Sequence, residues 1–219
     1  MSLSQKLHAA AAPIWKKTLR HPFVVGLGNG SLSLDRFRFY MCQDYVFLIE
    51  YSRTLALATA KAADLETMGR FAHLLDVTLN QEMALHREFA AECGISTETL
   101  AATQPAPTTQ AYTNHLVRVA SLGDLAEIVC GLLPCQWGYS EIGQLLVQQG
   151  KPTANPDYAK WIDMYASPEF AALSAWLREL LDSLAPKTDE EQLTRIFQTS
   201  TRYEYLFWEM AYRKQDWPV

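Results

Sequence analysis

The segment 34–63 predicts a long helix that is apolar on nearly all of its faces. Such a helix cannot lie on a surface, because its apolar faces have to be covered by other helices. Helical periodicity recurs along most of the chain, whereas the sustained alternation of polar and apolar residues that indicates strands is absent. We therefore expect an all-α bundle with this segment in its interior.

Seven further segments carry helical periodicity, which makes a bundle of about eight helices in a single domain spanning 1–219. Asp124 followed by Glu127, and Thr188 followed by Glu191, have the spacing of helix N-terminal capping boxes. The segments 21–33 and 103–110 are predicted to be loops. The other predicted helices span 4–19, 64–93, 111–122, 124–150, 157–165, 168–183 and 188–214.

Charge and composition exclude several classes of protein. The net charge is -5, and Lys and Arg are scattered, which argues against nucleic acid or an anionic membrane as a partner. No run of apolar residues is long enough to span a bilayer, and no signal peptide is evident, so we expect a cytoplasmic protein. No pair among Cys42, Cys93, Cys130 and Cys135 has the C-x-x-C spacing.

Phosphate, metal and cofactor sites find little support in the sequence. The glycines of 26–30 fit neither G-x-G-x-x-G nor G-x-x-x-x-G-K and predict a loop with positive φ angles. Glu82 and His86 are four residues apart, but no second carboxylate–histidine pair matches them, as a di-iron bundle would require. We expect neither a metal nor a cofactor.

Two carboxylates fall on apolar helix faces. Asp44 shares a face with Tyr40 and Phe47, and Glu204 lies between Ser200 and an aromatic pair. Burial of an unpaired carboxylate is costly and raises its pKa. Either each one is paired for structural reasons, or together they mark a pocket. Their occurrence on two different helices, each among aromatic residues, favours the pocket.

Pro134 and Cys135 lie deep inside the predicted helix 124–150. A proline in a helix interior costs about 3 kcal/mol, because it removes a backbone donor and crowds the preceding turn. The freed amides near the break would favour a thiolate at Cys135. A buried cysteine beside a tolerated kink accounts for the same residues, so the local sequence leaves both interpretations open.

Taken together, several segments in order resemble the TenA family, also called thiaminase II or aminopyrimidine aminohydrolase. They are HPFVVGLGNGSLSLDRFRFYMCQDYVFLIEYSR, LLPCQWGYSEIG, YAKWIDMYASPEF and TRYEYLFWEMAYRKQDW, so the resemblance covers nearly the whole chain. It implies a haem-oxygenase-like all-α fold, a homotetramer with one pocket per subunit, and no required metal.

Matched position by position, the resemblance implies a catalytic cysteine at Cys135, a pyrimidine-binding aspartate at Asp44 and an active-site glutamate at Glu204. At position 47 many family members carry tyrosine, so the polar contact of that hydroxyl is in doubt here. The aromatic positions of the implied substrate pocket are Phe47, Tyr51, Tyr112, Tyr139, Tyr165 and Phe207.

The implied reaction is hydrolysis at the methylene on position 5 of a 4-amino-2-methylpyrimidine. The aminomethyl pyrimidine would yield hydroxymethylpyrimidine and ammonia, and thiamin would yield the same alcohol and a thiazole. Two alternatives stay open: a non-catalytic regulatory protein that binds pyrimidine or thiamin, and an oxidase on the haem-oxygenase-like fold. A DNA-binding regulator would carry a basic face, and such an oxidase would carry metal or haem ligands; neither is evident in the sequence.

Overall fold

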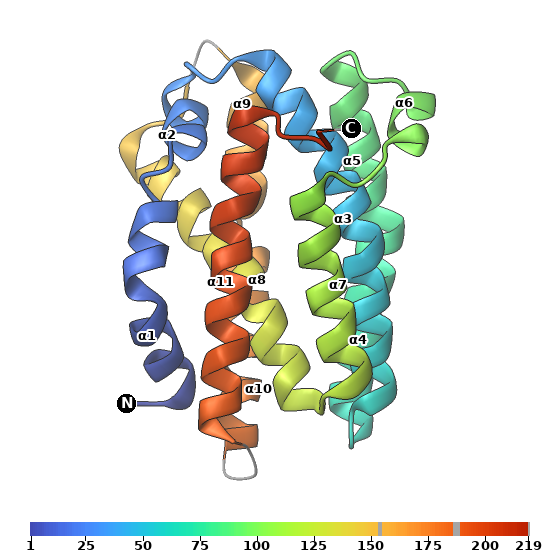
Figure 1. The fold of residues 1–219 in the computed structure, drawn as a ribbon, viewed down its shortest axis with the longest axis vertical. Helices are drawn as coiled ribbons and strands as arrows, with labels where there is room; N and C mark the ends of the chain where they lie inside the picture. The colour runs from blue at the N-terminus through green and yellow to red at the C-terminus, as the bar shows by residue number, and fades with distance from the viewer. Residues whose placement is uncertain (153–154, 186–188, 219) are drawn as a thin grey trace. The chain divides into compact units, whose positions relative to one another are not determined.

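The computed structural model describes residues 1–152, 155–185 and 189–218, and within these ranges the chain is helical with no β-strand (Figure 1). This confirms the all-α prediction, although the described residues form more helices than the eight expected. The helices are α1 (Leu3–Thr18), α2 (Pro22–Asn29), α3 (Leu34–Lys61), α4 (Leu65–Val77), α5 (Met83–Glu92), α6 (Thr97–Ala102), α7 (Pro107–Leu122), α8 (Leu125–Gln149), α9 (Pro156–Tyr165), α10 (Pro168–Leu184) and α11 (Glu190–Arg213), with a π-helical turn (Thr78–Glu82) between α4 and α5.

The chain separates into two compact units. The first unit comprises Met1–Ser33 and Val129–Glu209, and in it α1 packs against α10 and α2 against α9. The second unit comprises Leu34–Ile128 and Met210–Val219, and in it α3 packs against α4 and α7 (Figure 1). The two long helices α8 and α11 each contribute residues to both units.

The long apolar segment forms α3, as predicted. Its buried residues include Tyr40, Asp44, Phe47 and Leu55. The helix is not covered all round, however, because Ile49 is 37% exposed. A broad face of α3, rather than its whole circumference, is therefore buried.

The prediction of a loop over 21–33 was wrong for most of that segment, because α2 occupies Pro22–Asn29. His21 caps the helix, with its Nδ1 accepting from the backbone N–H of Phe23 at 3.1 Å. Gly30 ends the helix with a φ of 78°, and it alone among the glycines of this stretch has a positive φ. Gly28 is helical and lies so close to Leu146 that a Cβ would be 2.5 Å from a methyl carbon of that leucine.

The expected linker 103–110 is also partly helical, since α7 begins at Pro107. Gln43 of α3 holds this segment in place. Its side-chain Oε1 accepts from the Ala106 backbone N–H at 2.9 Å and from the Thr109 hydroxyl at 2.6 Å, and its Nε2 donates to the Gln104 carbonyl at 3.1 Å. The order comes from a contact distant in sequence, which local patterns do not show.

The helix predicted over 124–150 is continuous through Pro134, so the proline does not end it. Asp124 and Glu127 form the expected capping box: the Asp124 N–H donates to the Glu127 carboxylate at 2.9 Å, and the Asp124 carboxylate accepts from the Glu127 N–H at 3.0 Å. The other predicted cap, Thr188, lies outside the described residues. At the start of α11, the Asp189 carboxylate accepts from the Glu191 backbone N–H at 3.0 Å.

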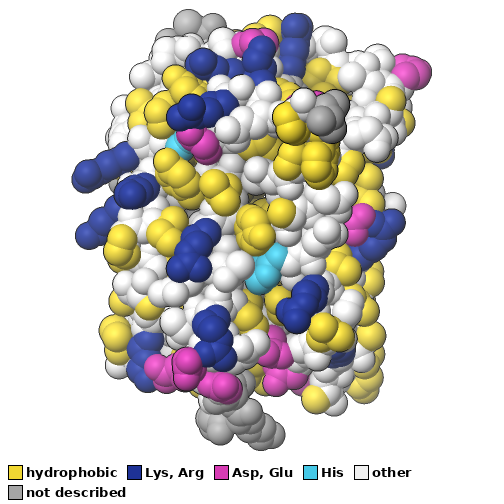
Figure 2. Space-filling view, in the orientation of Figure 1, with side chains coloured by type: hydrophobic (Ala, Val, Ile, Leu, Met, Phe, Trp, Pro, Cys, Tyr) yellow, Lys and Arg dark blue, Asp and Glu magenta, His cyan; other side chains and the backbone are white. Residues whose placement is uncertain are grey.

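No helix in the described part of the chain is long and apolar enough to cross a membrane. On the face drawn in Figure 2, Lys and Arg side chains are interspersed with acidic and hydrophobic ones. This agrees with the scattered basic residues noted in the sequence.

Candidate active site

In the second unit, Asp44 of α3 lies opposite His86 of α5. The Nε2 atom of His86 is 3.3 Å from Oδ2 of Asp44, and both side chains are 7% exposed. The sequence correctly placed Asp44 on a buried face but did not identify the histidine as its neighbour. The four-residue spacing of Glu82 and His86 suggests only a possible metal motif and does not point to Asp44.

Glu82 is the second carboxyl group near Asp44. It ends the π-helical turn Thr78–Glu82, one helical turn before His86. Burial raises the pKa of its carboxyl group from 4.5 to about 7, and the negative charge of Asp44 adds to the rise. π-Helical turns occur frequently at functional sites. Glu82, His86 and Asp44 therefore make a polar cluster that the residue spacing along the chain does not predict.

Aromatic side chains of the same unit lie on α3 and α7. The ring of Phe47 is 6.0 Å from that of Tyr51 and 5.1 Å from that of Tyr112, measured between centroids. All three residues are buried, and Phe47 lies on the same face of α3 as Asp44. The structure thus brings three of the expected substrate-binding residues together. Flat aromatic walls near a carboxylate suit a planar ligand with an amino group.

The first unit holds the remaining predicted residues. Cys135 on α8 is partly exposed, and Tyr139 lies one helical turn further along the same helix. The Tyr139 ring is 4.7 Å from that of Tyr165 at the end of α9 and 5.1 Å from that of Trp208 on α11. The structure therefore pairs the two expected tyrosines and adds Trp208, which is not among the site residues predicted from the sequence.

Close backbone packing fixes Tyr165 against α8. A Cβ at Gly143 would lie 2.5 Å from the carbonyl carbon of Tyr165 and 2.6 Å from the Ala166 nitrogen. Only a residue without a side chain permits this approach. Gly143 follows Tyr139 by one helical turn, so it sets the spacing at which the two tyrosine rings meet.

Glu204 is 6% exposed, as its position on the apolar stripe of α11 predicted. A small cavity of about 10 Å³, with room for about one water molecule at most, is lined by Glu204, Pro134, Gly138 and Trp208, among others. The proline that seemed anomalous in sequence thus lies beside the buried carboxylate. Phe207 is also buried on α11, at 3% exposure.

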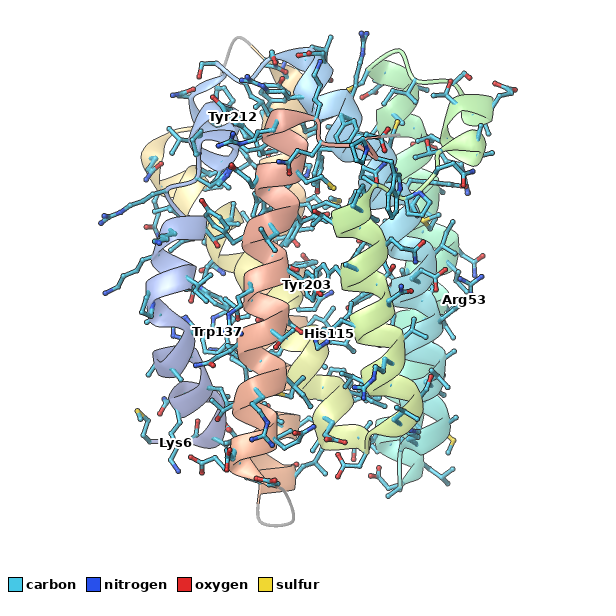
Figure 3. The ribbon with its side chains drawn as sticks, in the orientation of Figure 1. Lys6, Arg53, His115, Trp137, Tyr203 and Tyr212 are labelled. Carbon is cyan, nitrogen blue, oxygen red and sulfur yellow. The ribbon has the colours of Figure 1, made fainter. Side chains whose placement is uncertain are left out.

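The opposite side of α8 packs against α1 and α10. Trp137, labelled in Figure 3, stacks on His8 with 4.4 Å between ring centroids, and the Arg178 guanidinium lies 4.7 Å from the centre of the indole ring. Trp15 donates from its indole N–H to Glu141 at 2.7 Å. These contacts hold the helix that carries Cys135 from the side away from Tyr139.

A more open hollow of about 270 Å³ lies at the end of α1. Its lining includes the exposed cations Lys16, Lys17 and Arg20, and none of the predicted site residues. Within the described ranges, no group of three or more His, Cys, Asp or Glu side chains is arranged to hold a metal ion.

The fold and these residue clusters define a helical protein with two groups of aromatic rings, one on the helices that carry Asp44 and Tyr112 and the other around Tyr139. Buried aromatic side chains with a few polar groups are typical of sites for small planar ligands. The TENA/THI-4/PQQC family model matches residues 8–214, and the chain belongs to this family.

Relatives support the same assignment over nearly the full length. The chain is 46% identical to an aminopyrimidine aminohydrolase of Halalkalibacterium halodurans, over 99% of this chain and 98% of the relative. It is 40% identical to an aminopyrimidine aminohydrolase of Bacillus subtilis, over 99% of this chain and 92% of the relative.

Solved structures give the same fold. A TenA homologue from P. horikoshii matches with a TM-score of 0.92 at 32% identity, over 97% of this chain and 99% of that one. A domain of unknown function with a haem-oxygenase-like fold from Shewanella denitrificans matches with a TM-score of 0.77 at 16% identity, over 96% of this chain and 92% of that one. The second likeness concerns the fold alone and agrees with the haem-oxygenase-like architecture expected from the sequence.

Proposed function

We propose that this protein is a hydrolase of thiamin salvage that cleaves 4-amino-5-aminomethyl-2-methylpyrimidine to the 5-hydroxymethyl pyrimidine and ammonia. The observation that carries the proposal is the 46% identity to an aminopyrimidine aminohydrolase over 99% of this chain. Thiamin has the same pyrimidine and a leaving group on the same methylene, so it is a second substrate, and its cleavage would release the thiazole.

The substrate is a flat ring that presents a ring nitrogen beside an amino donor. We assign Asp44 as the acceptor for the amino group, because an ionised carboxylate accepts hydrogen bonds and its buried position excludes competing water. The aromatic residues that contact the ring would be Phe47, Tyr51, Tyr112, Tyr139, Tyr165 and Phe207. Phe47 stacks without a hydroxyl and so contributes apolar contact only.

The proposed chemistry begins with the Cys135 thiolate, which adds to ring carbon 6 while Glu204 donates a proton or hydrogen bond to the ring nitrogen. The electrons of the resulting enamine then expel the amine from the methylene on carbon 5, which leaves as ammonia once protonated. Water adds to the exocyclic methylene, and the ring regains its aromaticity as the thiol departs. Tyrosine hydroxyls would orient the water and assist the proton transfers.

A substitution of the thiol tests this mechanism. Cys135→Ser should reduce turnover of the aminomethyl pyrimidine by at least about 100-fold, because a hydroxyl is a far weaker nucleophile than a thiolate, while binding of the product pyrimidine stays measurable. Cys42→Ser is the matched control, since Cys42 is also partly exposed and is not among the proposed site residues. Ammonia release and hydroxymethylpyrimidine are assayed together. Rates like those of the wild type in Cys135→Ser would exclude the nucleophile assignment.

We also propose that the whole chain acts as one domain, assembles as a homotetramer and works in the cytoplasm. The resemblance to the TenA family supports the tetramer, and the lack of a membrane-crossing helix in the described residues is compatible with the location. Light scattering of the purified protein measures the assembly directly, and a monomeric mass would contradict the tetramer.

A further inference from the structure

The contact between Asp44 and His86 carries an inference beyond the residues matched to the family. Both side chains are buried, and Nε2 of His86 is 3.3 Å from Oδ2 of Asp44. The two groups come from different helices, α3 and α5, that pack together within one unit. Among the described ion pairs, Asp44 is the one carboxylate of α3 that contacts this imidazole.

The environment of His86 leaves Asp44 as its polar partner. Neither ring nitrogen has an aligned hydrogen-bond partner within the described part of the chain, and both nitrogens are buried. The imidazole packs beside the Tyr45 ring, at 6.0 Å between centroids. A buried imidazole with no hydrogen bond is costly, so a small rotation that aligns Nε2–H with Asp44 is favourable. Hydrogen bonds in active sites often tighten in this way only when the substrate binds.

Recognition of an amino group places two requirements on the carboxylate, and the contact with His86 can meet both. A carboxylate that accepts from an amino group has to be ionised and has to present one oxygen in a fixed direction. Burial disfavours the ionised form unless another donor compensates. A donor on Oδ2 satisfies both needs, since it stabilises the charge and leaves Oδ1 for the ligand.

Glu82 fits the same arrangement. Its carboxyl lies near Asp44, and its raised pKa, about 7, keeps it largely neutral in mildly acidic solution. The His86 imidazole then lies near one negative charge, that of Asp44, rather than near two. The π-helical turn places Glu82 and His86 on successive turns beside α3.

We propose that His86 is a positioning residue for substrate recognition: its Nε2–H holds one oxygen of Asp44, so that the other oxygen is directed at the amino group of the aminopyrimidine. The identity of the substrate rests on the proposed function, whereas the Asp44–His86 contact does not.

Binding and turnover test the consequence for the substrate. His86→Leu removes the donor at similar volume, and His86→Gln keeps an amide donor of similar reach. Titration calorimetry with 4-amino-5-hydroxymethyl-2-methylpyrimidine should show binding about 10- to 100-fold weaker in the Leu variant, the range for a hydrogen bond to a charged group, with most of the loss recovered in the Gln variant. His73→Gln, at an exposed histidine of α4, is the control.

The aminohydrolase assay on the same variants separates positioning from a general loss of folding. A positioning role predicts a raised KM, with recovery in His86→Gln, while thermal unfolding of the Gln variant stays close to that of the wild type. Equal affinity in the wild type and the Leu variant would overturn the inference. So would a loss in the Gln variant as large as in the Leu variant.

NMR of the imidazole nitrogens tests the contact without any substrate. The proton of neutral His86 is expected on Nε2, and its signal should move in Asp44→Asn but not in His73→Gln. A proton on Nδ1, or a signal unaffected by Asp44→Asn, would refute the contact. If the wild-type protein neither binds nor hydrolyses the pyrimidine, the proposed function fails, and the NMR result still decides the inference about His86.

Discussion

Replacement of Glu82 by glutamine should stabilise the protein, and the gain should grow with pH. Glutamine has the shape of a protonated glutamate but cannot ionise, so it removes the charge that burial and Asp44 disfavour. The pKa of the Glu82 carboxyl rises from 4.5 to about 7 on folding. Because the folded chain binds this proton more tightly, the free energy of unfolding falls as pH rises from about 4.5 to about 7 and stays lower above that range.

The magnitude follows from the two pKa values. At about 1.4 kcal/mol for each tenfold change in proton affinity, full ionisation of Glu82 costs the folded state roughly 3 kcal/mol at pH 8. At pH 5 the folded carboxyl is still protonated and the unfolded one is only partly ionised, so the cost is about 1 kcal/mol. The stability advantage of Glu82→Gln should therefore increase by about 2 kcal/mol between pH 5 and pH 8.

Urea unfolding of both proteins at the two pH values, followed by tryptophan fluorescence, measures this difference. The comparison of variant and wild type at each pH cancels the other titrating groups. Glu88→Gln is the matched control, because Glu88 lies exposed on α5, and its effect should stay within about 0.5 kcal/mol at both pH values. An advantage of Glu82→Gln that is absent, or that shrinks as pH rises, would refute the assigned cause.

Two further substitutions test the packing and capping of α8. Gly143→Ala should lower the free energy of unfolding by about 1–3 kcal/mol, because its Cβ would lie 2.5 Å from the Tyr165 carbonyl carbon and α9 would have to shift. Gly69→Ala is its control, since that glycine is helical with open space around it, and it should be neutral or stabilising; equal effects would contradict the packing argument. Asp124→Ala should lower the free energy of unfolding in urea by about 0.5–2 kcal/mol, because the Glu127 backbone N–H loses the Asp124 carboxylate as its acceptor. An unchanged free energy of unfolding would show that this cap does not stabilise the protein.

Local sequence rules worked best where a feature depends on residues close together in the chain. The capping box of Asp124 and Glu127 and the buried stripe that contains Glu204 were both predicted correctly. The local rules were less reliable where a feature depends on contacts with residues distant in the sequence. The helix over Pro22–Asn29 was missed because its glycines suggested a loop, whereas Gly28 provides close contact with Leu146.

The same distinction between local and distant features applies to the candidate site. The carboxylates were recognisable because Asp44 and Glu204 interrupt apolar helical faces, a pattern that a single helix displays. The partner of Asp44 was not recognisable, since His86 lies on another helix and a π-helical turn lies just before that helix. No spacing rule joins residues of α3 and α5, because α4 and the π-helical turn separate them in the sequence, so this contact emerged only from the packed structure.

By itself, the sequence determined that the chain folds as packed helices, since helix periodicity and caps are local properties. Its resemblance to a family predicted which residues would take part in catalysis. Tertiary structure decided the surroundings of those residues: the imidazole beside Asp44, the second carboxyl of Glu82, and the small cavity that Pro134 shares with Glu204. The physical reason is that burial and charge depend on neighbours brought together by packing, which the order of residues along one helix does not specify.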